Sequence, residues 1–165
     1  MSESTPSRTP SGNGGGYTYE WPRPMVTVDA IVFRPAGAPN PQAAEWEVLL
    51  IERGRDPFAG SWALPGGFVD IDEDLEPAAH RELEEETGLS GIALEQLRTF
   101  GTPGRDPRGR SVTVAYVGTA PAGATVLAAD DAAAARWWPL SALPDLAFDH
   151  DDVLAHGVRW LHRDR

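Results

Sequence analysis

The sequence contains no cysteine, and all 14 of its basic residues are arginine because lysine is also absent. The lack of cysteine excludes disulfides, thiolate metal sites and cysteine nucleophiles, and it fits a reducing compartment. No apolar run approaches the roughly 20 residues that a membrane span requires, and the N-terminus has no apolar signal-peptide core. These absences predict a cytoplasmic protein without a membrane partner.

Large apolar side chains are nearly missing from residues 1–16, which consist almost entirely of Ser, Thr, Pro, Gly and Asn. Such a segment cannot offset its own ordering entropy, so we predict a disordered tail. The remaining chain, 17–165, holds the apolar material and the six tryptophans. That amount suffices for the core of one domain but not of two.

Positive charge is scarce, since the net charge is −11 and the sequence pI is about 4.7. Nucleic-acid binding depends on clustered basic residues that neutralise phosphates, so no nucleic-acid partner is expected. One local exception exists, because three arginines fall within residues 105–110. This cationic loop is suited to a small anionic ligand.

The patterns of apolar and β-branched residues predict two groups of strands, each followed by a helix. The predicted strands are 26–33, 46–53, 92–100, 111–119 and 136–140, and the predicted helices are 72–88 and 149–163. The order of strands, helix, strands and helix favours an α+β fold, an α/β/α sandwich with a mixed sheet between helices.

The helix over 72–88 has the clearest signals, because Pro77 lies near its start and Gly88 is placed to end it. Within it Glu82, Glu85 and Glu86 are spaced i, i+3 and i+4, so their carboxylates share one face. Like charges at this spacing repel one another. A hard cation such as Mg²⁺ would relieve the repulsion, whereas the alternative is an acidic face exposed to solvent.

The residues around these carboxylates follow a defined spacing. Gly67 is followed by five residues, Glu73, seven residues, and then Arg81-Glu82-Leu83-Glu84-Glu85-Glu86-Thr87-Gly88-Leu89. This pattern resembles the Nudix box at every defined position, and the preceding Trp62–Gly66 stretch is also similar to that family. The resemblance implies a Nudix fold and Mg²⁺-dependent hydrolysis of the diphosphate linkage of a nucleoside diphosphate derivative.

The resemblance also implies roles for individual residues. Glu82, Glu85 and Glu86 would be catalytic metal ligands for two or three Mg²⁺ or Mn²⁺ ions, together with the carbonyl of Gly66. Glu73 and Arg81 would form an ion pair, and Gly67 and Gly88 would serve turn and cap geometry at positive φ. The general base stays open, because Asp130, Asp131, Glu85 and Glu86 are all candidates, and the two aspartates have the alternative of a solvated loop.

The stretch 100–116 and Pro22-Arg23-Pro24 look like the ADP-ribose-handling branch of the family. The guanidinium groups of Arg55, Arg105, Arg108 and Arg110 could bind a diphosphate, although Asp106 should pair with at least one of them. Trp21 or Trp62 could stack on adenine, but aromatic side chains are more often part of a core.

Two alternatives accompany the hydrolysis of ADP-ribose to AMP and ribose 5-phosphate. One is a nucleoside triphosphate pyrophosphatase that removes non-standard nucleotides. The other is a non-catalytic ADP-ribose sensor, as in regulators of this branch that carry a DNA-binding domain. Because the chain stops at Arg165 and keeps every box carboxylate, we expect the enzyme, acting as a homodimer by analogy with related hydrolases.

Overall fold

The computed structural model describes residues 19–37, 45–128 and 132–163, so the predicted tail and the candidate bases Asp130 and Asp131 lie outside the described residues. The described chain forms one seven-stranded sheet and two helices. The strands are β1 (Met25–Pro35), β2 (Trp46–Arg53), β3 (Trp62–Ala63), β4 (Gly66–Phe68), β5 (Leu94–Phe100), β6 (Ser111–Thr119) and β7 (Ala132–Pro139). The helices are α1 (Leu75–Thr87) and α2 (His150–Leu161).

The sheet is mixed, as predicted, and its main order is β3-β2-β1-β6-β5. The central strand β1 runs parallel to β6 and antiparallel to β2 and β4. The predicted strands 26–33 and 46–53 are therefore both present, and they pair with each other as a hairpin. Strand β7 adds to the other side of β2, and β5 pairs with β6.

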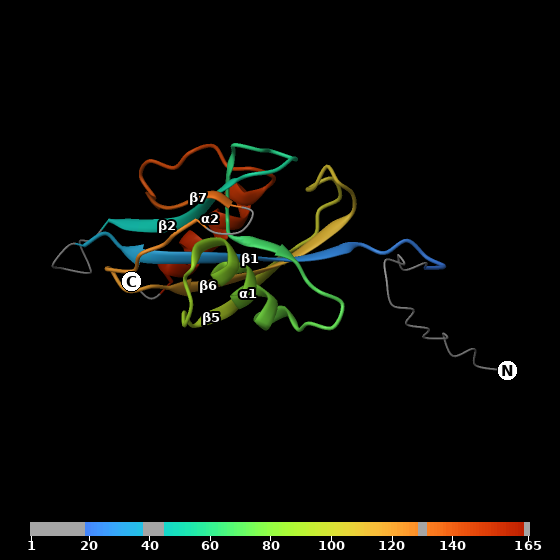
Figure 1. The fold of residues 1–165 in the computed structure, drawn as a ribbon, viewed down its shortest axis with the longest axis horizontal. Coiled ribbons are helices and arrows are strands. Elements are labelled where there is room, and N and C mark those ends of the chain that lie inside the picture. Colours follow the sequence, from blue (N-terminus) through green and yellow to red (C-terminus); the bar gives the residue numbers. More distant parts are fainter. Residues whose placement is uncertain (1–18, 38–44, 129–131, 164–165) are drawn as a thin grey trace.

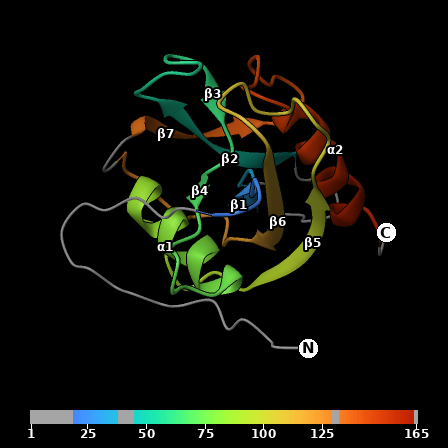
Figure 2. The same cartoon turned by 90° about the vertical axis from the view of Figure 1, so that its right-hand side faces the viewer.

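Successive residues of β1 point to opposite faces of the sheet, and each face is covered by one helix (Figures 1 and 2). Ile31 and Phe33 pack with Leu154 of α2. Ala30 and Val32 pack with Leu83 of α1 on the other face. The α+β sandwich expected from the order of elements is confirmed.

Helix α1 has caps at both ends. The side chain of Asp74 accepts a hydrogen bond from the amide of Leu75, and Gly88 ends the helix with a φ of 68° in the left-handed region. A residue without a Cβ adopts that conformation at little cost, so the predicted role of Gly88 is confirmed. The helix begins at Leu75 rather than Asp72, because Asp74 is the cap.

Two predictions about strands were incomplete. Strands β3 and β4 lie between the predicted strand 46–53 and the predicted helix 72–88, where no strand was predicted, and they are two and three residues long, which is too short to show a period. Strand β7 begins at Ala132 instead of Arg136, because its alanines have weak β propensity and are held by pairing with β2. No helix in the described ranges is long and apolar enough to cross a membrane.

Candidate active site

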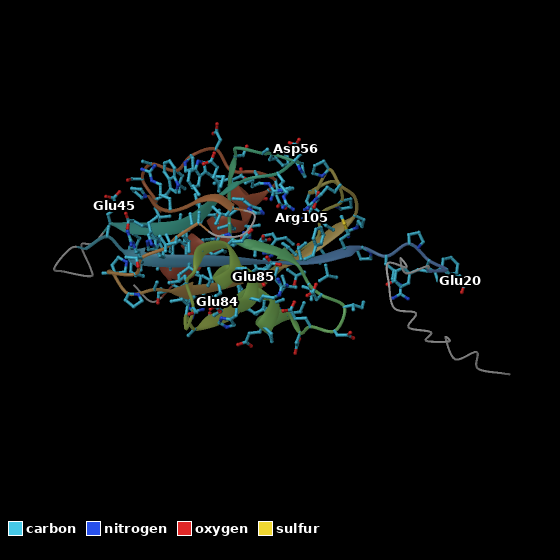
Figure 3. All side chains as sticks on the ribbon, viewed as in Figure 1. Glu20, Glu45, Asp56, Glu84, Glu85 and Arg105 are labelled. Carbon is cyan, nitrogen blue, oxygen red and sulfur yellow. The ribbon has the colours of Figure 1, made fainter. Side chains whose placement is uncertain are left out.

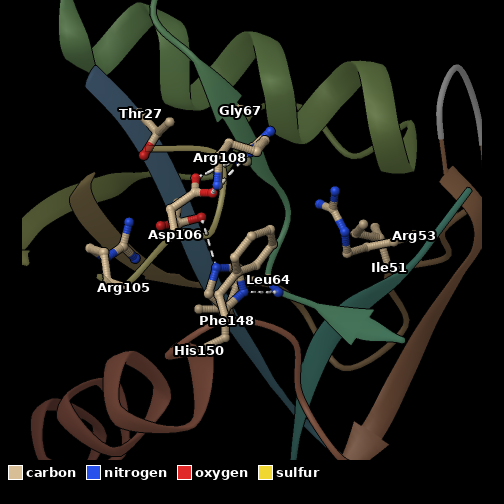
Figure 4. A pocket seen from close by; sticks show the side chains of 12 residues that line it. Thr27, Ile51, Arg53, Leu64, Gly67, Arg105, Asp106, Arg108, Phe148 and His150 are labelled. Atoms are coloured by element: carbon tan, nitrogen blue, oxygen red, sulfur yellow. Dashed lines mark hydrogen bonds and ion pairs between the residues drawn. The ribbon is translucent and has the colours of Figure 1, made fainter. Parts of the chain in front are cut away.

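A cleft opens between α1, the β4 region and the loop that carries the arginine cluster. It has a volume of about 450 Å³ and is lined by the box carboxylates on one side and by Arg53 and Arg108 on another. A second cavity of about 40 Å³ continues from it toward the start of α2 (Figure 4). Figure 3 shows Glu85 on the α1 side of this region. The three predicted metal ligands, Glu82, Glu85 and Glu86, all line the cleft.

Among these three carboxylates, Glu86 has the pKa that burial raises most clearly. It accepts a hydrogen bond of 2.9 Å from the amide of Gly66 and forms no ion pair with any residue in the described ranges. Burial raises the pKa of Glu86 to about 8, and the negative charges of Glu82 and Asp29 add to the effect. A carboxylate in such surroundings favours either a proton or a cation.

The predicted ion pair between Glu73 and Arg81 is present. The guanidinium donates from Nε and Nη2 to the two carboxylate oxygens of Glu73, each at 2.8 Å. Its Nη1 also donates to Glu82 at 2.9 Å and to Glu85 at 3.0 Å. Hydrogen bonding to Arg81 lowers the pKa of Glu73, whereas burial raises the pKa of Glu82 despite its contact with Arg81.

Gly67 serves a purpose other than the predicted one. Its φ is not in the left-handed region, so turn geometry does not require a glycine there. The position lies in β4, and a Cβ added to it would fall 2.4 Å from Oε1 of Glu82. Gly67 is needed because the backbone approaches the carboxylate closely, and the prediction of positive φ was wrong for this residue.

The donor set fits a divalent cation in its chemistry. It consists of oxygen atoms only, it includes the partly buried Glu86, which accepts a hydrogen bond from the amide of Gly66, and hard cations such as Mg²⁺ prefer carboxylate and carbonyl oxygens. The ligands are not preassembled, since the described part of the chain contains no group of three or more acidic or imidazole side chains arranged to hold a metal. Arg81 accounts for this, because its guanidinium occupies the space between Glu82 and Glu85.

The raised pKa of Glu86 predicts a pH-dependent stability for the metal-free protein. The folded-state pKa of about 8 lies above the usual 4.5, so the folded protein keeps a proton that the unfolded chain releases. The free energy of unfolding should therefore contain a contribution that falls as the pH rises from about 4.5 to about 8. Denaturant unfolding of chelator-treated protein, compared with Glu86→Gln, isolates this contribution; equal slopes for the two proteins would contradict it.

Substituting Gly67 tests the close approach of β4 to α1. Gly67→Ala should lower the free energy of unfolding by only about 1 kcal/mol, because the added methyl group displaces the end of the Glu82 side chain from its hydrogen bond with Arg81 while the backbone stays in place. Gly123→Ala is the matched control, since a Cβ there meets no atom within 4 Å and its φ is ordinary. Urea titrations of both variants measure the difference, and an unchanged Gly67→Ala protein would disprove the contact.

Two guanidinium groups face the carboxylates across the cleft. Arg108 pairs with the buried Asp106, as expected for one arginine of the loop, with Nη2 to Oδ2 at 2.8 Å. Arg53, at the end of β2, donates from Nε to the carbonyl of Pro57 at 2.8 Å. Burial and the nearby positive charge of Arg108 lower the pKa of Arg53. Sequence reasoning missed Arg53, because a strand end carries no motif of its own.

The other predicted substrate contacts are placed differently. Arg105 forms an ion pair with Asp149, with Nη2 to Oδ1 at 2.6 Å, and its side chain is only 5% exposed. Arg110 donates to the carbonyl of Ser111, and Arg55 lines the cleft. The structure therefore brings Arg55 and Arg108 to the cleft, while Arg105 lines the adjoining smaller cavity as part of an ion pair.

Neither tryptophan proposed for adenine stacking lines the cleft. Trp21 is 74% exposed and lies beyond the start of β1, next to Glu20, which Figure 3 shows far from Glu85. Trp62 packs edge-on against Trp138, with ring centroids 5.1 Å apart, and contributes to the core. The core interpretation that accompanied the prediction holds for Trp62.

Comparisons with known proteins agree with this geometry. The model of the NUDIX domain matches residues 23–161. The chain is 38% identical to an ADP-ribose pyrophosphatase of Methanocaldococcus jannaschii, covering 83% of this chain and 75% of that protein. It is 40% identical to the ADPR responsive transcriptional repressor NtrR of Acinetobacter baylyi, covering 82% of this chain but about half, 53%, of the repressor.

A solved structure shows the same fold. The NUDIX domain of Shewanella oneidensis NrtR, crystallised with ADP ribose, superposes with a TM-score of 0.76 at 35% identity, covering 86% of this chain and 90% of that chain. The domain match spans most of the chain, and the cleft is lined by the glutamates of α1, by Gly67 of β4 and by Arg81, which pairs with Glu73. The chain therefore belongs to the Nudix family.

Proposed function

We propose that this chain hydrolyses the diphosphate bond of ADP-ribose, giving AMP and ribose 5-phosphate, with Mg²⁺ or Mn²⁺ as the cofactor. The observation that carries the proposal is that one cleft is lined by both carboxylates and guanidinium groups. The carboxylates belong to α1 and the guanidinium groups to β2 and to the arginine-rich loop, and the residues are Glu82, Glu85, Glu86, Arg53 and Arg108. A diphosphate is the kind of group that needs both, a cation held by carboxylates on one side and guanidinium donors on the other. The names of the similar archaeal enzyme and of the ADP ribose complex support this substrate.

The residues that line the cleft have three proposed roles, which are metal binding, substrate binding and positioning of the carboxylates. Glu82, Glu85, Glu86 and the carbonyl of Gly66 would hold two or three Mg²⁺ ions, which when bound lower the pKa of water and stabilise charge on phosphorus. Arg53 and Arg108 bind phosphate oxygens and orient the diphosphate. Arg81, held by Glu73, keeps the carboxylates of α1 in place.

The chemical step is an attack of water on one phosphorus of the diphosphate. A new phosphorus–oxygen bond forms, and the bridging oxygen leaves with the other phosphate, so that each product carries a monophosphate. The attacking water gives its proton to a carboxylate, for which Glu85 and Glu86 in the cleft and Asp130 and Asp131 in the undescribed segment are the candidates. The pH profile of kcat for variants at each of these positions separates them.

A substrate panel tests the proposal directly. Purified protein is incubated with Mg²⁺ and ADP-ribose, NADH, a GDP-sugar, 8-oxo-dGTP or a dinucleoside polyphosphate, and the products are separated by chromatography. Preferential release of AMP from ADP-ribose supports the proposal. Release of pyrophosphate from the triphosphate would instead support the alternative of nucleotide removal and exclude ADP-ribose as the main substrate.

An ADP-ribose sensor is the second candidate, because the similarity to the repressor NtrR is as high as that to the pyrophosphatase. Binding of ADP-ribose without turnover of any compound in the panel would favour it. The prediction of no nucleic-acid partner is tested by DNA mobility shifts, since a relative of this branch has been crystallised with a 27mer DNA. Sedimentation tests the proposed homodimer, and fractionation of cells tests the cytoplasmic location.

A further inference from the structure

Three consecutive residues at the start of α2 contact three different parts of the site. Phe148 contacts the arginines of the cleft, Asp149 contacts the loop that carries Arg108, and His150 contacts the segment before Gly66. Figure 4 shows Phe148 and His150 within the pocket, near Arg53, Arg108 and Leu64. None of these three residues belongs to the Nudix box.

The ring of Phe148 lies against two guanidinium groups. The Cζ atom of Arg53 is 4.8 Å from the ring centroid, and that of Arg108 is 5.5 Å from it. Arg108 also lies over the ring of Phe68, at 4.8 Å from its centroid. The two cations repel each other, and an aromatic face attracts a cation, so the ring stabilises an arrangement that the charges alone oppose.

The backbone of Phe148 points to the same role. Its φ of 57° is in the left-handed region, which a bulky side chain rarely adopts. Strained conformations of this kind persist where the surroundings hold them, and they cluster at functional sites. A glycine or asparagine would adopt this conformation more easily, but neither offers a ring to the arginines.

The next two residues fix the ring relative to the cleft. Asp149 forms two hydrogen bonds with the guanidinium of Arg105, at 2.6 and 2.9 Å, which attach the loop carrying Arg108 to the start of α2. Nδ1 of the buried His150 accepts a hydrogen bond of 3.0 Å from the amide of Leu64. Its Nε2 lies 3.5 Å from Oδ1 of Asp29, whose other oxygen accepts a hydrogen bond of 2.6 Å from Thr113.

We propose that Phe148 is a positioning residue for the diphosphate, and that its ring holds the guanidinium groups of Arg53 and Arg108 together at the cleft, where both can bind phosphate oxygens. Asp149 attaches this part of the chain to the loop that carries Arg108, and His150 attaches it to the segment before Gly66. The proposal rests on the proposed function, because it assigns the two guanidinium groups to a diphosphate.

Substituting Phe148 tests this role. Phe148→Leu keeps an apolar side chain but removes the aromatic face, and Phe148→Tyr keeps the face. We expect Phe148→Leu to raise the KM for ADP-ribose about tenfold with a smaller change in kcat, and Phe148→Tyr to stay within about twofold of the wild type. A purely structural role would lower the melting temperature without this division between KM and kcat.

Matched controls separate the ring from general packing. Phe100→Leu removes another ring that lies near an arginine, Arg98 at 5.9 Å, outside the cleft, and it should leave KM unchanged. In an Arg53→Ala background, Phe148→Leu should have a smaller effect, because one of the groups that the ring positions is gone. If Phe148→Leu does not fold, Phe148→Met replaces it as the aliphatic variant.

The outcomes distinguish this proposal from the proposed function. An unchanged KM in Phe148→Leu, or an equal loss in Phe148→Tyr, overturns the positioning role while hydrolysis of ADP-ribose by the wild type stands. If the wild type does not hydrolyse ADP-ribose, the affinity for inorganic pyrophosphate, measured by calorimetry with Mg²⁺, replaces KM. The same order of variants in that measurement supports the positioning role, and equal affinities overturn it.

Discussion

Glu86→Gln is expected to reduce kcat for ADP-ribose by about a thousandfold or more while leaving the fold intact. Glutamine keeps the size of the side chain and can still accept the hydrogen bond from the amide of Gly66. It removes the negative charge that a bound cation needs, and such charge stabilisation contributes several kcal/mol to the reaction. The metal-free variant should be at least as stable as the wild type near pH 8, because the charge is buried beside Glu82 and Asp29.

Initial rates over a range of Mg²⁺ concentrations measure the effect, and circular dichroism checks the fold. The matched control is Glu84→Gln, which removes the same charge from an exposed position of α1 that does not line the cleft. Its rates should match those of the wild type. If Glu86→Gln kept near-native turnover, the assignment of the metal site to this face of α1 would be wrong.

Arg53→Ala is expected to lower kcat/KM for ADP-ribose about a hundredfold. The guanidinium is partly buried, hydrogen-bonded to Pro57, packed against the Phe148 ring and part of the cleft lining, so its loss should remove charge-assisted hydrogen bonds to a bound phosphate. The effect on stability should be small, because removing Arg53 also removes the repulsion from Arg108, which is one cause of its lowered pKa.

Steady-state kinetics of Arg53→Ala, Arg55→Ala and Arg98→Ala measure this contribution. Arg98 is the control, because it lies away from the cleft and contacts His156 and Phe100. Arg55 was the candidate that the sequence alone offered in this region, and it also lines the cleft. A large loss in Arg55→Ala with none in Arg53→Ala would reverse the assignment.

Local signals predicted the elements that frame the site. The position of Gly88, the 3.6-residue spacing of the glutamates and the runs of β-branched and apolar residues in β1 and β6 are properties of short stretches, and α1 and both strands follow them. The ion pair between Glu73 and Arg81 was implied by the resemblance to the Nudix box, and the two residues lie only eight positions apart in the chain. Such features need no knowledge of distant contacts.

Contacts between residues far apart in the chain could not be predicted from the sequence. The ring of Phe148 meets Arg53 across 95 positions, and His150 meets Leu64 across 86, and no periodicity connects them. Arg105 looked like a phosphate contact because it belongs to a cationic loop, but Asp149 pairs with it. The sequence also could not show why position 67 is a glycine, because the residue that leaves no room for a side chain there is Glu82, which lies on α1 and not on β4.

Strand β4 gives the cleft a floor that is also part of the sheet. Gly66 and Gly67 pair with Asp29 and Val28 of the central strand, and the amide of Ala30 donates to the carbonyl of Pro65 at 2.8 Å. Opening the cleft at this point requires breaking hydrogen bonds of the strand that organises the core. The floor should therefore share the slow amide hydrogen exchange of β1. Entry and release of a substrate would then depend on movement of the outer walls, while the segment proposed to hold the metal stays as rigid as the central strand.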